Sequence, residues 1–148
     1  MRFSRFLLFG VLLILGLVLA ACGASTQPTV TSNEASTSLT KNADGFTDIS
    51  VAQLSDMLKE KDFTLVNVHI PYSGDIPQTD VSIPYNRIQD NLNKLPENKD
   101  APIVVYCRSG AMSTAAAKTL VSLGYTNVME VDGGMNAWQA AGNQLVTK

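Results

Sequence analysis

The segment that most constrains the fold is an apolar run over residues 102–106, which ends at Cys107. Its sequence, Pro-Ile-Val-Val-Tyr, contains no charged side chain, so it is apolar on both faces. Strands of this kind are typical of the centre of a parallel sheet, where helices cover both faces. We therefore expect an α/β domain in which Cys107 follows a buried central strand.

Helical and strand patterns alternate around this run. Hydrophobic spacing and turn residues predict helices over residues 51–61, 88–95, 112–123 and 135–141, and strands over 64–69, 102–106 and 127–131. Ser50 and Gln53 form a capping-box pattern at the first helix. Residues 71–84 contain three prolines and a glycine and are predicted to form a loop. The carboxyl ends of the three strands would bring His69, Cys107 and Asp132 to one edge of the sheet, where ligand sites of such folds lie.

The residues after Cys107 favour an anion at the centre of a short loop. Ser109, Gly110 and Ala111 are small, so the loop can close and direct backbone N–H groups to one spot. The next helix adds unpaired N–H groups and partial positive charge, and Arg108 adds a full charge. We expect the pKa of the Cys107 thiol to be lowered and its nucleophilicity raised. The alternative interpretation is an inert core cysteine.

Residues 104–142 resemble the C-terminal half of a rhodanese domain. Three motifs carry the resemblance: Cys107-Arg108-Ser109-Gly110 as the active loop, residues 124–128 as a strand lead-in, and Gly133-Gly134-Met135 with Ala137-Trp138 as the closing motif. The resemblance extends more weakly back to residue 45. It implies a single rhodanese-like domain over residues 45–148, with a mostly parallel five-stranded sheet and helices on both faces.

The resemblance also implies sulfur transfer without a cofactor or a metal. The Cys107 thiolate would attack the outer sulfur of a donor such as thiosulfate or a persulfide, and the resulting Cys107 persulfide would pass that sulfur to a thiol or protein acceptor. The residues implied in binding the sulfur species are those of the loop and the helix start: Arg108, Ser109, Gly110, Ala111, Met112 and Ser113. Ser113 has the alternative role of capping the helix.

The sequence departs from the family pattern in two places. Asn67-Val68-His69 stands where the family usually has Asp-Val-Arg, so we expect an ion pair that normally braces the site to be missing. His69 is either a general base or, as we favour, a structural hydrogen-bonding residue. Met112 stands where the family often has Arg, Lys or Thr, which favours a less charged donor, such as a persulfide, over thiosulfate.

Several other classes of function are disfavoured. Phosphatases and arsenate reductases need an arginine six positions after the cysteine, where this chain has Ser113. One histidine and two cysteines exclude a multi-histidine or four-cysteine metal centre, so no metal is expected. A net charge of −2 without a basic cluster argues against nucleic acid as a partner. A non-catalytic persulfide carrier or partner-binding module of the same fold stays open.

The N-terminal segment has the features of an export and anchoring signal. Residues 1–21 combine a basic start, an apolar run over 6–18 and small residues before Cys22, which is typical of a secretory signal. Leu19-Ala20-Ala21-Cys22 resembles the lipobox of bacterial lipoproteins, which implies a lipid on Cys22. Residues 22–44 are rich in Ser and Thr and predict a disordered tether. A transmembrane anchor and an ordinary cleaved signal are the alternatives.

We therefore expect the domain in the bacterial cell envelope, anchored to a membrane by lipid and facing the extracytoplasmic side. Several acyl chains on one residue give stable anchoring where a single chain would be marginal. Lipidation of Cys22 would leave Cys107 as the one free thiol of the chain.

Overall fold

The computed structural model describes residues 39–147. The expected signal segment (1–21), Cys22 and the tether up to residue 38 lie outside the described residues. Within residues 39–147, no helix has the length and apolar character needed to cross a bilayer.

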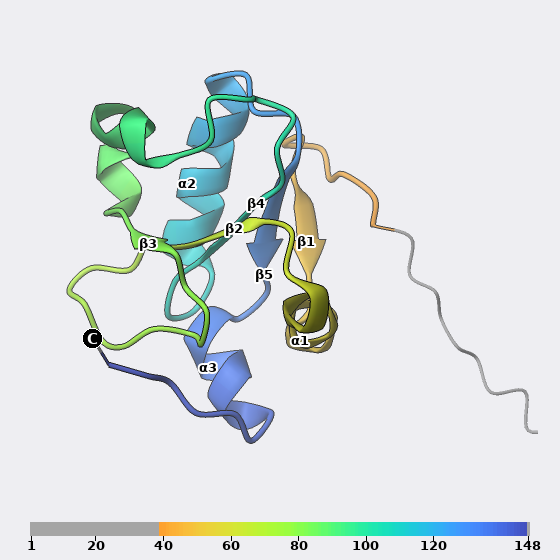
Figure 1. The fold of residues 1–148 in the computed structure, drawn as a ribbon, viewed down its shortest axis with the longest axis vertical. Helices are drawn as coiled ribbons and strands as arrows, with labels where there is room; N and C mark the ends of the chain where they lie inside the picture. The colour runs from red at the N-terminus through yellow and green to blue at the C-terminus, as the bar shows by residue number, and fades with distance from the viewer. Residues whose placement is uncertain (1–38, 148) are drawn as a thin grey trace, which may run out of the picture. The chain divides into compact units, whose positions relative to one another are not determined.

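The centre of the described region is a parallel sheet of five strands in the order β1-β5-β4-β2-β3 (Figure 1). The strands are β1 (Thr47–Ile49), β2 (Thr64–Asn67), β3 (Val81–Ser82), β4 (Ile103–Tyr106) and β5 (Val128–Val131). All four residues of the central strand β4 are buried. The expected five-stranded parallel sheet with a buried central strand before Cys107 is therefore confirmed.

Helices cover both faces of this sheet (Figure 1). The helices are α1 (Val51–Met57), α2 (Ala111–Ser122) and α3 (Gly134–Ala140), with 3₁₀ segments at Leu58–Glu60, Tyr85–Arg87 and Gln89–Lys94. Leu120 of α2 packs with Ile88 on one face, and Leu54 of α1 packs with Trp138 of α3 on the other. Alternate residues of β4 enter the two cores, so Val105 and Cys107 face α2 while Val104 and Tyr106 face α1 and α3.

The helix predicted over residues 88–95 is wrong in type. The chain forms 3₁₀ turns there, and Asn91 has non-helical dihedral angles. Asn91 donates its side-chain N–H to the carbonyl oxygen of Arg87 at 2.8 Å. Asn and Asp side chains compete for backbone groups in this way and weaken an α-helix.

Two short strands were not predicted individually. β1 has three residues, and β3 has two and lies inside the predicted loop 71–84. Runs of this length carry too little alternation to be recognised in the sequence. β3 is placed instead by its neighbour Asp80, whose carboxylate accepts the N–H of Leu65 at 2.7 Å and so ties the loop to β2.

The first predicted helix is present, but its end tightens into a 3₁₀ turn at Leu58–Glu60. Its capping box is confirmed, because Ser50 Oγ accepts the N–H of Gln53 and Gln53 Oε1 accepts the N–H of Ser50. The strand predicted over 64–69 ends at Asn67, whose side-chain oxygen accepts the N–H of His69.

Candidate active site

Cys107 lies between the end of β4 and the start of α2, and it is 1% exposed. Its Sγ atom accepts the backbone N–H of Gly110 at 3.1 Å and the hydroxyl of Ser113 at 3.3 Å. The loop and the first turn of α2 therefore direct two donors at one sulfur, from residues three and six positions along the chain.

Gly110 allows this loop to close over the sulfur. Its φ is +103°, a conformation that residues with a Cβ rarely adopt. Gly110 also precedes the first residue of α2 as its N-cap, without any side-chain capping bond. The alternative role of Ser113 as the helix cap is therefore wrong. Ser113 lies inside the first turn of α2, fully buried, with its hydroxyl next to the sulfur.

The start of α3 holds the outer side of the same loop. The backbone N–H groups of Met135 and Asn136 donate to the carbonyl oxygens of Cys107 and Arg108, each at 2.9 Å. Gly134 lies so close that a Cβ there would be 2.1 Å from the Cys107 carbonyl oxygen. These two hydrogen bonds hold the loop from its outer side, while the N–H of Gly110 donates to the sulfur.

These contacts change the acidity of the Cys107 thiol. Burial raises its pKa, but the hydroxyl of Ser113 and the backbone N–H groups of Ser109, Ser113 and Gly110 lower it by more. The net result is a thiol pKa below its ordinary value. Hydrogen bonds to the charged form favour that form, so the site stabilises a thiolate at the sulfur position.

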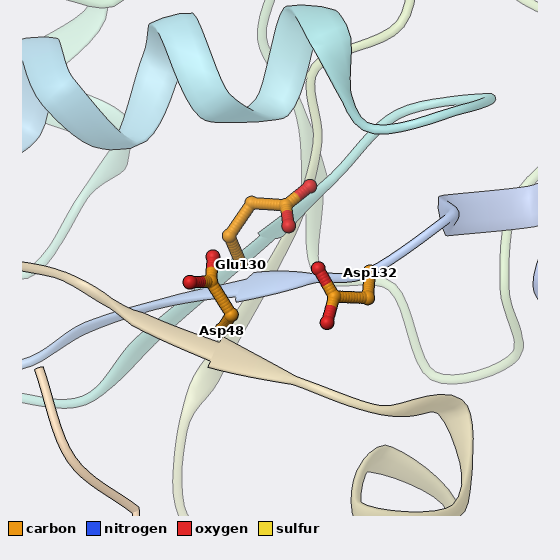
Figure 2. Close-up of side chains that lie close together, drawn as sticks. All are labelled: Asp48, Glu130 and Asp132. Carbon is orange, nitrogen blue, oxygen red and sulfur yellow. The ribbon is translucent and has the colours of Figure 1, made fainter. Parts of the chain in front are cut away.

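A buried carboxylate, Glu130 of β5, lies on the other side of Ser113. Ser113 Oγ, whose single proton serves one acceptor at a time, also lies within hydrogen-bonding distance of Glu130 Oε1, at 2.5 Å, and Glu130 is 2% exposed. The carboxylates of Asp48, Glu130 and Asp132 lie within 4.8 Å of one another, and Figure 2 shows Glu130 pointing toward α2. Burial raises the pKa of Glu130 to about 7, Ser113 opposes this rise, and Asp132 and Asp48 add to it.

Sequence reasoning missed Glu130. β5 pairs with β4 so that Glu130 lies beside Val105, two residues before Cys107, on the face covered by α2. The available signal was a carboxylate in the strand Val128–Val131, which otherwise has only apolar residues and is buried throughout. Buried acids are rare unless they are paired, so an acid in such a strand indicates a specific partner inside the protein.

At Asn67, where the family usually has Asp, the structure shows a network of hydrogen bonds. The ion pairs described within residues 39–147 join other residues than Asn67 and His69. Asn67 is buried and donates to the carbonyl oxygen of Gly74 at 2.9 Å and to Asp75 Oδ1 at 2.8 Å. Fully buried Asp75 also accepts from the hydroxyls of Tyr72 and Tyr106. A hydrogen-bonded network thus braces this side of the sheet edge.

His69 was predicted as the last residue of the strand, but it lies two residues beyond the end of β2. Burial and the nearby positive charge of Arg108 lower its pKa, which favours the neutral imidazole. Its Nδ1 atom is buried and has no hydrogen-bond partner within residues 39–147. No hydrogen bond joins His69 to Cys107 among the described contacts, whereas Gly110 and Ser113 contact the sulfur directly.

The remaining predicted loop residues lie around the sulfur without side-chain bonds to it among the described contacts. Arg108, Ser109 and Ala111 are exposed, so their side chains line the outer surface of the loop. Met112 is half-buried and packs against the core cluster that contains Cys107. The contribution of Ser109 to the thiol comes from its backbone N–H.

This arrangement of strand, closed loop and helix can be compared with known proteins. The sequence model of the rhodanese-like domain family matches residues 42–141. The chain belongs to the rhodanese-like family. The match includes all five strands, the Cys107 loop and α3, so the fold expected from the motifs is confirmed.

Curated relatives and solved structures agree with this rhodanese-like assignment. The chain is 32% identical over 106 residues to the thiosulfate sulfurtransferase GlpE of Pseudoalteromonas translucida, which covers 70% of this chain and 98% of the relative. It is 33% identical over 103 residues to a sulfurtransferase of Allochromatium vinosum, covering 67% and 94%. A rhodanese-related protein of Thermoplasma volcanium superposes with a TM-score of 0.59 at 28% identity, covering 68% of this chain and 98% of that one.

Proposed function

We propose that this rhodanese-like protein is a sulfurtransferase that carries sulfane sulfur as a persulfide on Cys107. The observation that carries the proposal is the placement of Cys107 Sγ at the start of α2, where the Gly110 N–H and the Ser113 hydroxyl donate to it. The names of two relatives, both sulfurtransferases that align over nearly their whole length, add support.

The proposed reaction has two steps. The Cys107 thiolate attacks the outer sulfur of the donor, the sulfur–sulfur bond of the donor breaks, and the leaving group departs with the electron pair. That leaving group is sulfite from thiosulfate and a thiol from a persulfide. An acceptor thiolate then attacks the outer sulfur of the Cys107 persulfide and restores the free thiolate. The donors around Sγ stabilise negative charge in both the free and the loaded states.

The burial of Cys107 restricts the donor. Because this residue is 1% exposed, the donor must present its reacting sulfur at the end of the molecule. Thiosulfate and persulfides both do so. The apolar side chain of Met112 beside the loop adds no charge for a dianion, so a persulfide donor is the better fit.

A sulfur-transfer assay tests the proposal. The purified full chain would be mixed with glutathione persulfide or thiosulfate and an excess of acceptor thiol, and the sulfide released would be measured. We expect the wild-type chain to release sulfide above the rate of the protein-free mixture, faster with the persulfide, and Cys107→Ser to give only the protein-free rate. No turnover by the wild type with either donor would instead favour a non-catalytic carrier or partner-binding module, and equal turnover by Cys107→Ser would show that Cys107 does not carry the sulfur.

We further infer that the protein is held at the bacterial cell envelope by lipid on Cys22 and faces the extracytoplasmic side. The support is in the sequence alone: a basic start, the apolar run 6–18, and Leu-Ala-Ala before the cysteine. Mass spectrometry of chain extracted from membranes should find an N-terminal acylated Cys22. A wild-type chain that stays in the membrane fraction with its leader uncleaved and no acyl group on Cys22 would instead indicate a transmembrane anchor.

A further inference from the structure

Three side chains from three elements form a continuous path from the reactive sulfur to a buried acid. Ser113 of α2 lies in the middle, with its Oγ 3.3 Å from Cys107 Sγ and 2.5 Å from Glu130 Oε1. All three residues are at least 98% buried. Neither the loop nor the helix N-terminus requires an acid at this place, so Glu130 is not explained by the activation of the thiol described above.

We propose that Glu130 takes up the proton of the Cys107 thiol through the hydroxyl of Ser113, so that the first thiolate to form is paired with a neutral Glu130. This inference rests on Cys107 being the reacting thiol of the proposed function, but it concerns the free enzyme before any donor binds. Glu130 acts on the sulfur through Ser113 and is therefore a positioning residue.

The single proton of the Ser113 hydroxyl couples the sulfur to the carboxylate. A hydroxyl donates one hydrogen bond at a time, and three acceptors lie within reach: Glu130 Oε1, Cys107 Sγ and the Gly110 carbonyl oxygen at 2.9 Å. An ionised Glu130 can only accept, so it holds the Ser113 proton and leaves Sγ with the backbone donors. A neutral Glu130 donates to Ser113 Oγ and frees the Ser113 proton for the sulfur.

The proton shift is balanced without any other reactant. The S–H bond of Cys107 breaks as an O–H bond forms on Ser113, and the original Ser113 proton moves to Glu130 Oε1. One negative charge thereby passes from the carboxylate to the sulfur, and Ser113 ends as a neutral hydroxyl that donates to the thiolate. Nothing is oxidised or reduced.

The surrounding charges support this exchange. On the Glu130 side, the acids Asp132 and Asp48 oppose a charged carboxylate. On the Cys107 side, the backbone N–H groups of the loop favour a thiolate, and burial together with the charge of Arg108 holds His69 toward its neutral form. Lys118 of α2 is paired with Asp44 at 2.9 Å. Each side thus favours the charge arrangement that the proton shift produces.

A pH profile of thiol alkylation tests the proposal directly. The full chain would react with iodoacetamide across pH 4 to 10, and the modification would be followed on the tryptic fragment 100–108, which contains Cys107 but not Cys22. Coupled groups titrate in two shared steps, so the wild-type rate should rise in two steps separated by a shelf. Glu130→Gln keeps the shape of the side chain but cannot take up the proton, so its rate should rise in a single step.

Two further variants separate a relay from a merely structural role. Ser113→Ala should react about tenfold more slowly near neutral pH, because a hydrogen bond to the anion is lost. Adding Glu130→Gln to Ser113→Ala should then change the rate by less than about twofold, because the path is already broken. Asp132→Asn, which removes an acid near Glu130 but has no contact with Ser113 among those described, should keep both steps.

A single step in the wild type, or two unchanged steps in Glu130→Gln, would overturn the proposal. An equal effect of Glu130→Gln with and without Ser113 would also overturn it. Alkylation requires only the thiolate, so these results can be read even if Cys107 transfers no sulfur, and failure of the relay is distinguishable from failure of the proposed function.

Discussion

At the scale of single residues, Met112 is the position that bears most on the choice of donor. It is half-buried and packs beside the loop, and it supplies no charge for a bound anion. Met112→Arg should therefore raise the rate of thiosulfate loading about threefold to fivefold, the range of an exposed ion pair. Stopped assays of sulfite release from thiosulfate measure this rate.

The control for this prediction is Met112→Gln, which is polar but uncharged and should give no increase. The gain with Met112→Arg should also fade as salt is added, because exposed charges are screened. An equal gain with both variants, or a gain that persists in high salt, would show that the charge of residue 112 does not select the donor.

At the scale of elements, the contact between the start of α3 and the Cys107 loop fixes the position of the loop backbone around the sulfur. A Cβ on Gly134 would lie 2.1 Å from the carbonyl oxygen of Cys107, and its φ is +52°. Gly134→Ala should thus destabilise the fold by about 3 kcal/mol, because backbone must move. The same shift of the loop carbonyls should slow alkylation of Cys107 near neutral pH about tenfold, as the N–H donors lose alignment.

Gly142 offers a matched comparison at the other end of α3. It also has a positive φ, +85°, but a Cβ there would meet nothing within 4 Å. Gly142→Ala should cost about 1 kcal/mol from backbone strain alone and leave the alkylation rate unchanged. Denaturant unfolding and alkylation of the two variants check the prediction, and equal losses in both would contradict the assigned contact between α3 and the loop.

The elements differ in how well the sequence predicted them. β4 and α2 follow from a long apolar run and a periodic helix, and α2 ends within one residue of the prediction. β1 and β3 are too short to carry a pattern. The segment 88–95 has the spacing of a helix, but the bond of the Asn91 side chain to the carbonyl oxygen of Arg87 favours 3₁₀ turns there.

In the site, too, the residues close to Cys107 in sequence could be predicted, whereas those that only the fold brings near it could not. The Cys107 loop is local in sequence, so its N–H donors could be predicted from strand, small residues and helix in succession. Glu130 and Asp75 could not be placed, because the pairing of β5 with β4 and the fold of the loop after β2 bring them to the sheet edge. Both residues are buried acids, which local patterns treat as surface positions.

At the scale of the whole molecule, Glu130 should make stability depend on pH. Its pKa is raised from 4.5 to about 7 in the folded chain, so between these values the folded state binds a proton that the unfolded state has released. Stability should therefore fall as pH rises through this window, by up to about 3 kcal/mol. Glu130→Gln should lack this fall and be the more stable chain at pH 8.

Denaturant unfolding of both chains at several pH values checks this prediction. The difference between the wild type and Glu130→Gln reports the titration of Glu130 together with the groups coupled to it, Cys107 through Ser113 and Asp132 by its charge. Asp132 has a raised pKa of its own, from burial and from Asp48. A difference that stays constant between pH 4.5 and 8 would contradict a buried Glu130 with a raised pKa.

In the proposed function, Cys107 becomes a persulfide while Gly110 and Ser113 donate hydrogen bonds to its Sγ atom. The most direct measurement is intact-protein mass spectrometry of the full chain under non-reducing conditions, after incubation with glutathione persulfide and, separately, with thiosulfate. We predict a gain of one sulfur, about 32 Da, in the wild type, located on the tryptic fragment 100–108 that contains Cys107 but not Cys22, and no gain on that fragment in Cys107→Ser. No gain with either donor, or the same gain in Cys107→Ser, would contradict the claim.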